Sequence, residues 1–430
     1  MVSPLLQPFR DISAKLSLQP LTEEKELEEL KVEYAPDVLA ELQQLIEDNS
    51  SKDNKILVTG HRGCGKSTLL VELSRNLQNN YFVVFFSIAD AIGTSNIDHI
   101  DLLFFITHNL IQTAHKQNLN IDKKLPDSFY QWFAKRTKIN EEQYKAEVAA
   151  GFNLFTLLEG KFKADSGIRY EIKQEFRNYF SELIERIELI NHAIFEIAKK
   201  PVLVIIDDLD KLDLHLINDI FHENIKSLFE PSFTIVFTLP ISAFRDITLK
   251  GTLITETNNQ IVLMPVSKLF TKDTIHQFNA PPEKQEFLRL QNILEKRINP
   301  DLIETETLDK IIVYSGGVLR ELIRISNECC NLCLRLVRSN PDRTDIKIND
   351  DILTQAIKNI RLNYFEAGLG KTDYDILTTT YHKFEPEDPN NESFLKKLLH
   401  SLYVLEYRND DIWYDVHPIV IEILRRRELI

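Results

Sequence analysis

The segment from residue 55 to residue 73 constrains the fold of this 430-residue chain more than any other part of its sequence. Residues 55–59 are Lys-Ile-Leu-Val-Thr, a short apolar run typical of a buried parallel strand. Residues 60–68 are Gly-His-Arg-Gly-Cys-Gly-Lys-Ser-Thr, and an apolar stretch with helical spacing follows. A strand, a glycine-rich loop and a helix in this order predict the first part of an α/β fold built on a parallel sheet.

The glycine-rich loop matches the pattern G-x-x-x-x-G-K-[ST], which predicts a P-loop that binds the phosphates of ATP or ADP. Glycines let backbone N–H groups close around phosphate oxygens, and the helix that follows presents its positive end. Lys66 is expected to neutralise the β- and γ-phosphates and to assist catalysis, while Ser67 supplies a hydroxyl to Mg²⁺. Thr68 is expected to pack or to contact the α-phosphate. The predicted nucleotide-binding residues of the loop are Gly60, Gly63, Cys64, Gly65, Lys66, Ser67 and Thr68.

A second apolar run, residues 202–206, ends in two aspartates and predicts a central strand whose carboxyl end lies beside the phosphates. Asp207 is expected to hold Mg²⁺ through water. Asp208 is the predicted catalytic carboxylate that orients or deprotonates the attacking water. Alternatively, Asp208 and Asp210 are the polar exit of a loop from the strand.

Three further apolar runs predict strands at residues 81–87, 233–238 and 260–264, which makes five in all. Helical or mixed segments separate them, so we expect a parallel sheet covered by helices on both faces. Thr238, at the end of one run, is placed to bond the γ-phosphate or the lytic water. An ordinary hydroxyl at a strand end explains it equally well.

The remaining segments are predicted to be mostly helical. A helix is expected at residues 170–198, where apolar residues recur every three or four positions. The apolar segment 149–158 is interpreted as a hairpin, a docking surface or buried packing. Two helices and a hairpin in residues 373–416 indicate a winged helix. The predicted domains are a helical leader (1–54), a P-loop core (55–266) with a helical insertion (about 94–199), a helical lid (267–365) and a winged helix (366–430).

Composition narrows the classes of partner. The formal net charge of -14 disfavours general binding to nucleic acid, although the run Arg425, Arg426 and Arg427 offers a local basic patch or a solvated helix end. No segment has the ~20 apolar residues of a membrane span, and no secretory signal is evident, so a cytoplasmic protein is expected. Three of the four cysteines fall in residues 329–333, where packing is favoured over metal binding.

With these motifs in order, the chain resembles the AAA+ and STAND ATPases, and within them the bacterial STAND-like ATPases and the replication-initiator group. The resemblance implies that Arg320, after Gly316 and Gly317, senses the γ-phosphate; a surface arginine paired with Glu321 is the alternative. It also implies that His417 contacts the β-phosphate of ADP, unless this histidine only caps the last helix.

Two departures from the AAA+ pattern qualify this resemblance. Asp208 replaces the usual glutamate, as in STAND proteins, and suits slow hydrolysis. Arg245 is the nearest candidate for an arginine finger, although a plain surface charge is favoured. The chain differs from the membrane-anchored P-loop branch called KAP in that nothing in it is expected to span a bilayer.

The function expected from these features is a Mg²⁺-dependent ATPase that acts as a molecular switch. Its nucleotide state would control self-assembly or a protein partner, in bacterial defence or regulation as the resemblance suggests. The alternative is an ATP-gated DNA-binding initiator or transposition regulator that uses its winged helix. A small-substrate kinase is disfavoured because the chain carries lid and wing features that such kinases lack.

Overall fold

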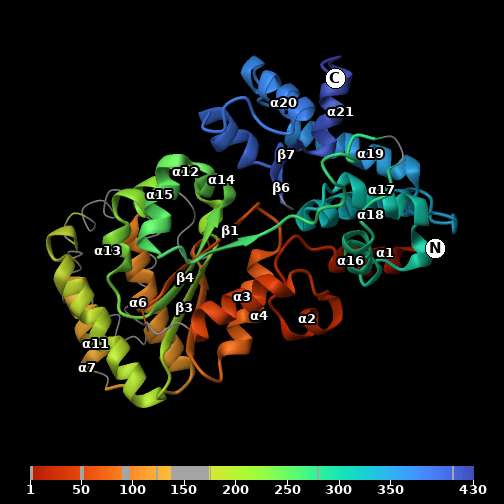
Figure 1. Ribbon diagram of the computed structural model, residues 1–430. Helices are drawn as coiled ribbons and strands as arrows, with labels where there is room; N and C mark the ends of the chain where they lie inside the picture. Colours follow the sequence, from red (N-terminus) through yellow and green to blue (C-terminus); the bar gives the residue numbers. More distant parts are fainter. Residues whose placement is uncertain are drawn as a thin grey trace. The chain divides into compact units, whose positions relative to one another are not determined.

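The computed structural model describes residues 3–48, 53–89, 97–122, 124–136, 174, 176–277, 280–408 and 411–430 (Figure 1). By their contacts these residues form two compact units. Unit 1 contains Met1–Asp37, Gly60–Leu69 and Leu263–Ile430, and unit 2 contains Val38–Thr59 and Leu70–Val262. The domain limits predicted at residues 54, 266 and 365 follow chain order instead, and they stay predictions.

A parallel sheet carries most of unit 2. Its strands are β1 (Lys55–Gly60), β2 (Phe82–Ser87), β3 (Val202–Asp207), β4 (Thr234–Pro240) and β5 (Ile261–Met264), in the order β2-β3-β4-β1-β5. β3 pairs in parallel with both neighbours, so that Ile206 lies opposite Phe86 and Phe237. Every residue of β1, β3 and β4 is buried, as strands covered on both faces require. The predicted α/β fold with five strands is confirmed.

Helices connect the strands of unit 2. They are α3 (Pro36–Glu47), α4 (Lys66–Leu77), α6 (His99–Lys116), α7 (Lys124–Arg136), α11 (Phe180–Ala198), α12 (Leu214–Asn218), α13 (Ile225–Phe229), α14 (Ile241–Arg245) and α15 (Ile247–Glu256), with short turns η1 (Leu209–Lys211) and η2 (Asp219–Glu223). α6 packs against β2, α11 and α13. Of the helix predicted at residues 170–198, the described residues 174 and 176–178 are helical, a turn follows at Tyr179, and α11 covers the rest up to Ala198. The single helix is therefore corrected to two helical stretches that the turn separates; residues 170–173 and 175 lie outside the described residues. Segment 149–158 lies outside the described residues.

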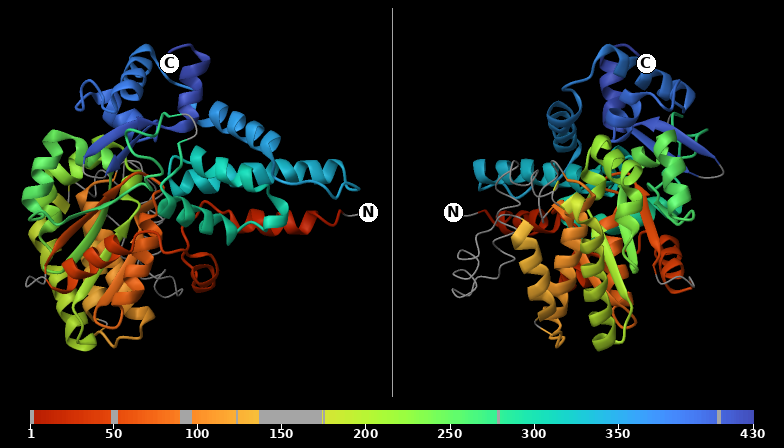
Figure 2. Two further views of the ribbon diagram at one scale, coloured as in Figure 1. Left: turned by 45° about the vertical axis from the view of Figure 1, so that its right-hand side comes forward. Right: turned by 90° about the vertical axis from the view of Figure 1, so that its left-hand side faces the viewer.

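Unit 1 is mainly helical (Figure 2). Its elements are α1 (Leu6–Lys15), α2 (Glu24–Leu30), α16 (Lys284–Glu295), η3 (Pro300–Leu302), α17 (Thr305–Tyr314), α18 (Leu319–Ser339), α19 (Asp350–Ile360), η4 (Arg361–Phe365), α20 (Lys371–Lys383), η5 (Phe394–Leu399), β6 (Val404–Arg408), β7 (Ile412–Val416) and α21 (Pro418–Arg426). β6 and β7 form an antiparallel hairpin. This is the element order predicted for a winged helix, an assignment that stays a prediction. No helix in the described ranges is long and apolar enough to cross a bilayer.

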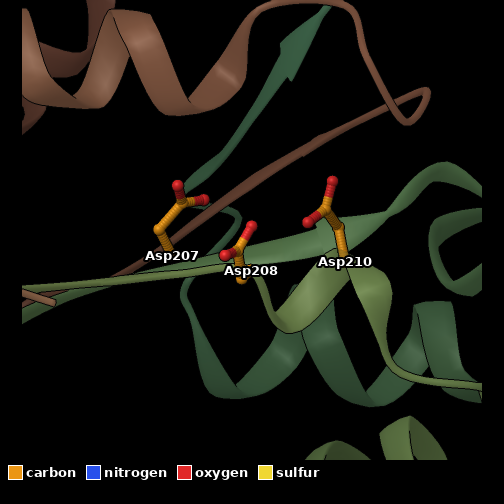
Figure 3. A group of neighbouring side chains, drawn as sticks. All are labelled: Asp207, Asp208 and Asp210. Atoms are coloured by element: carbon orange, nitrogen blue, oxygen red, sulfur yellow. The ribbon is translucent and has the colours of Figure 1, made fainter. Parts of the chain in front are cut away.

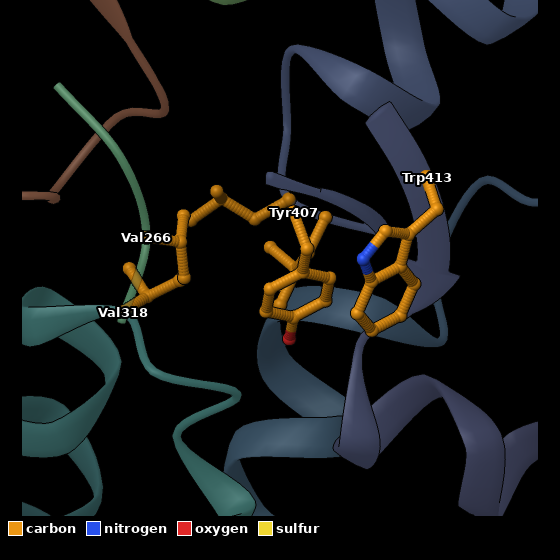
Figure 4. Close-up of a cluster of buried hydrophobic side chains, with 6 residues drawn as sticks. Val266, Val318, Tyr407 and Trp413 are labelled. Atoms are coloured by element: carbon orange, nitrogen blue, oxygen red, sulfur yellow. The ribbon is translucent and has the colours of Figure 1, made fainter. Parts of the chain in front are cut away.

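A hydrophobic cluster fixes the β6–β7 hairpin within unit 1 (Figure 4). The indole of Trp413 stacks on the ring of Tyr407 with 4.6 Å between centroids. The phenol of Tyr407 donates a hydrogen bond of 2.8 Å to the carbonyl of Gly316, just before α18. The hairpin is therefore anchored to the segment that enters α18. The buried members of the cluster are Val266, Val318, Leu402, Leu405, Tyr407 and Trp413.

Two hydrogen bonds tie α1 to α18. The thiol of Cys330 donates to the carbonyl of Phe9 at 3.2 Å, and the side-chain amide of Asn327 donates to the carbonyl of Leu16 at 2.8 Å. Because the later residue of α18 meets the earlier residue of α1, the two helices run antiparallel. Burial raises the pKa of Cys330 to about 12, so this thiol stays protonated and serves as a packing residue.

Candidate nucleotide-binding site

Gly63 lies where the P-loop meets the first residues of α18, both within unit 1. Its φ of +85° belongs to the left-handed region, which favours glycine. Its carbonyl accepts a hydrogen bond of 3.0 Å from the backbone N–H of Arg320. A Cβ added at Gly63 would stand 2.4 Å from Cβ of Arg320. Glycine is thus required at position 63 for the close contact that brings Arg320 beside the loop. The contact of Arg320 with the γ-phosphate stays a prediction.

The ammonium group of Lys66 lies on the P-loop itself. It donates hydrogen bonds to the carbonyls of Gly60, at 3.1 Å, and His61, at 2.9 Å, and its side chain is almost fully buried. Next to it, the hydroxyl of Thr68 accepts a hydrogen bond of 3.4 Å from the backbone N–H of Leu21. The leader therefore runs past the first turn of the helix that follows the loop.

His61 connects the P-loop to the C-terminal hairpin, a role that the sequence did not suggest. Its Nε2 accepts a hydrogen bond of 2.8 Å from the backbone N–H of Glu406, in the middle of β6. An accepting Nε2 places the proton of the neutral ring on Nδ1. Both residues are buried, at 2% and 4% exposure. They are 345 positions apart, so no local pattern could have revealed the contact.

Tyr34 anchors the leader to the turn before α18. Its hydroxyl accepts a hydrogen bond of 3.1 Å from the backbone N–H of Ser267 and lies 3.4 Å from the carbonyl of Gly317. Burial raises the pKa of Tyr34 above its usual range, so the phenol stays protonated and can donate. Gly317 is required here, because an added Cβ would come within 1.8 Å of the Ser267 carbonyl.

Three carboxylates meet in unit 2 at the end of β3 (Figure 3). One ligand oxygen each of Asp207, Asp208 and Asp210 lies within 4.8 Å of the others, and all three residues are buried. Asp208 accepts a hydrogen bond of 2.6 Å from Ser87 and pairs with the ammonium group of Lys211 at 2.6 Å. Oxygen ligands at this spacing fit a hard divalent cation such as Mg²⁺.

The backbone at Asp208 is unusual for a residue with a side chain. Its φ of 70° and ψ of 7° lie in the left-handed region. Such a conformation costs roughly 1–3 kcal/mol for residues other than glycine and is concentrated at functional sites. The turn that carries the carboxylates is therefore held in place by its surroundings.

Thr238 supplies one of the contacts that hold this turn. Its hydroxyl accepts a hydrogen bond of 3.1 Å from the backbone N–H of Leu209 and lies 3.5 Å from the carbonyl of Ile206. The side chain is completely buried. The structure thus gives Thr238 a positioning role that the sequence analysis missed, while its predicted contact with the γ-phosphate stays a prediction.

His417 caps α21. Its Nδ1 accepts a hydrogen bond of 3.2 Å from the backbone N–H of Ile419, and its ring stacks on Phe365 at 5.0 Å. Burial, with a smaller contribution from the charge of Arg324, lowers the pKa of His417 to about 3. The capping alternative therefore describes what this side chain does here, and contact with the β-phosphate of ADP stays a prediction.

Arg245 and Glu321 are two further positions that the sequence analysis considered. Arg245, at the end of α14, has its guanidinium 5.2 Å from the ring centre of Phe244. Glu321 is fully buried and pairs with Arg324 at 2.9 Å, and burial raises its pKa. The proposed pairing of Arg320 with Glu321 therefore has a competitor one turn further along α18.

Comparison with protein families finds one matching family model. Residues 37–239 match the model of the KAP family P-loop domain, so this segment is a P-loop NTPase domain. The contrast with KAP drawn from the sequence concerned only the lack of a membrane span, and the P-loop segment resembles that family all the same. No curated protein matches the chain in sequence.

Several solved structures are similar to this chain at low identity. Cdc6p from Pyrobaculum aerophilum is 12% identical with a TM-score of 0.42, over 97% of this chain and 99% of that one. The ORC2 protein of Aeropyrum pernix is 12% identical with a TM-score of 0.41, over 97% and 98%. A RuvB variant from Thermotoga maritima is 15% identical with a TM-score of 0.38, over 95% and 98%. These values carry no information about what the present chain binds.

Proposed function

We propose that this chain is an ATPase switch of the AAA+ and STAND kind, whose bound nucleotide decides whether the β6–β7 hairpin stays attached to the P-loop. The observation that carries the proposal is the hydrogen bond of 2.8 Å from the Glu406 amide to Nε2 of His61. The bond connects a P-loop residue to the C-terminal hairpin, and in the proposed switch this residue responds to the nucleotide. The match of residues 37–239 to a P-loop domain supports the proposal that the chain binds a nucleotide.

The proposed binding roles follow the chemistry of each group. Backbone amides of the loop and the ammonium group of Lys66 bind the phosphates, and Ser67 and Asp207 hold Mg²⁺. The metal would neutralise charge on the phosphates. The match of residues 37–239 to one P-loop domain contains both the loop and Asp207, which supports assigning them to the same nucleotide site.

The proposed catalytic roles belong to Asp208 and Thr238. Asp208 orients the attacking water, and Thr238 holds the turn in which Asp208 lies. Ser87 and Lys211 compete with that water for the oxygens of Asp208, which suits slow hydrolysis. Slow hydrolysis is what a switch needs, because each nucleotide state must last long enough to act on a partner.

The switch rests on differential binding. A nucleotide shifts an equilibrium only if it binds one conformation more tightly than the other. We propose that ADP favours the attached hairpin and that ATP, with a trigger, favours its release toward a protein partner or a second copy. Arg320 and His417 are the proposed sensors of the γ- and β-phosphates.

Limited proteolysis and light scattering, each with ADP, with ATP and without nucleotide, test this proposal. We expect a new cleavage pattern or a larger size with ATP. Lys66→Ala should weaken ATP binding roughly 10- to 150-fold, the value of a charge-assisted hydrogen bond, and should abolish the response. Arg62→Ala, which removes an exposed charge from the same loop, is the matched control and should change neither. Identical patterns in all nucleotide states would remove the switch from consideration.

A further inference from the structure

A hollow of about 370 Å³ lies between α1 and α18, both in unit 1 and away from the P-loop residues described above. Small-ligand sites usually measure roughly 300–1,000 Å³, so this hollow is large enough for a small molecule. It is lined by Arg10, Ser13, Asn331, Leu334, Arg335 and Arg338.

The charges around this hollow all have one sign. Arg10, Arg335 and Arg338 are exposed, and no carboxylate is among the described residues that line it. Within the described part of the chain, none of these three guanidinium groups forms a salt bridge. The chain as a whole carries a net charge of -14, so three uncompensated arginines at one place stand out from their surroundings.

The geometry of the two helices keeps the arginines together. Asn331, Arg335 and Arg338 are spaced by four and three residues, so they share one face of α18. Arg10 follows Phe9, whose carbonyl accepts the hydrogen bond from Cys330 in the neighbouring turn of α18. Each helix thus contributes cations to one hollow whose walls are fixed by buried contacts.

The helix dipole favours positive side chains at the C-terminal end of α18, but this effect explains only one of the three arginines. Arg338 lies in the last turn of α18, where a positive side chain complements the helix dipole. Arg335 lies a turn earlier, and Arg10 belongs to another helix with its own end at Lys15. Like charges brought together in this way repel one another, and an anion placed between them would remove that repulsion.

We propose that the hollow between α1 and α18 binds a small anion that carries two or more phosphate groups. The planar guanidinium fork matches two phosphate oxygens at once, and three such forks fit more than one phosphate group. The hydroxyl of Ser13 and the side chain of Asn331 supply further polar contacts. A small ligand is favoured over DNA because the arginines surround a hollow and the net charge of the chain repels a long polyanion.

Calorimetric titration with tripolyphosphate tests the proposal. The titration uses the full chain carrying Lys66→Ala, which removes the ammonium group from the P-loop. In that background, Arg10→Gln with Arg335→Gln should weaken tripolyphosphate binding roughly tenfold or more, since each charged hydrogen bond contributes strongly.

The matched control is Arg425→Gln with Arg426→Gln in the same background, which removes two exposed arginines from the end of α21. It should change the affinity by no more than about twofold. Without Lys66→Ala, the Arg10 and Arg335 variant should keep the tight binding of ATP with Mg²⁺ at the P-loop and lose only the weaker binding at the hollow, so the two sites are distinguished.

Two results would overturn the proposal. One is equal tripolyphosphate affinity in the Arg10 and Arg335 variant and in its control. The other is tighter binding of a short DNA duplex than of tripolyphosphate, lost in the same variant, which would make the hollow a contact for nucleic acid.

Discussion

Replacing His61 with alanine removes the acceptor that holds the backbone N–H of Glu406. The two groups are 2.8 Å apart and both residues are buried, so water does not readily replace the lost partner. A buried N–H left without an acceptor costs about 1–3 kcal/mol. This corresponds to a change of roughly 5- to 150-fold in the equilibrium between the attached and the released hairpin.

Hydrogen exchange at single amides measures this equilibrium directly. In His61→Ala, the amide of Glu406 should exchange faster by that factor. The amide of Tyr414, in strand β7 of the same hairpin, provides an internal reference. It donates a hydrogen bond of 2.8 Å to the carbonyl of Phe384, and His61 is not its acceptor. Arg62→Ala changes the neighbouring loop residue, which is exposed, and should leave both amides as they are.

The same measurement connects the contact to the nucleotide. If the switch operates as proposed, ADP protects the Glu406 amide and ATP exposes it, and His61→Ala removes the difference. Unchanged exchange of the Glu406 amide in His61→Ala would refute the reasoning, because the hydrogen bond would then stabilise nothing. Faster exchange that is the same with ADP and ATP would show that the hydrogen bond is stabilising but would reject its role in sensing the nucleotide.

Three further substitutions, one of them with a control, test other features of the structure. Gly63→Ala should lower the free energy of unfolding by about 1–3 kcal/mol through backbone strain, whereas Gly251→Ala, in an open position of α15, should raise it by up to about 1 kcal/mol; chemical denaturation measures both. Thr238→Val leaves the amide of Leu209 without its acceptor, so the rate of ATP hydrolysis should fall while calorimetry shows unchanged ATP affinity. The pKa of His417 falls from 6.5 to about 3 on folding, so the unfolded chain binds more protons between these values and stability drops as the pH falls. His417→Asn keeps a side-chain acceptor that can cap α21 but does not titrate. Between pH 7 and pH 5 its free energy of unfolding should therefore fall by about 2 kcal/mol less than that of the unmodified chain, as urea unfolding at each pH will show.

The sheet could be predicted because its signals are local. Each strand is a short apolar run, and the end of β3 is marked by the change from Ile206 to Asp207. Helix continuity was harder to predict, since a turn at Tyr179 separates the helical residues 176–178 from α11, where one helix was expected. The apolar positions of that segment continue across Tyr179, where the backbone turns, and side-chain spacing alone does not report such a turn.

The contacts around the P-loop could not be predicted, because they join residues far apart in the chain. The sequence indicated that the backbone needs glycine at positions 63 and 317, but it did not indicate that Arg320 and Ser267 are the residues that approach them. The acceptor role of His61 depends on β6, and the anchoring role of Tyr34 depends on the turn before α18. Both residues are common side chains without a distinguishing local pattern, so only the folded chain identifies them.

The left-handed backbone at position 208 limits which acids this site can accept in evolution. Aspartate and asparagine tolerate this conformation better than longer side chains do, because their short polar groups can bond locally. A lineage that gained glutamate here, the residue usual in faster AAA+ machines, would first have to rebuild the turn between β3 and η1. One codon change is therefore a poor route to glutamate at this position, because the main chain of the turn would have to change together with the side chain.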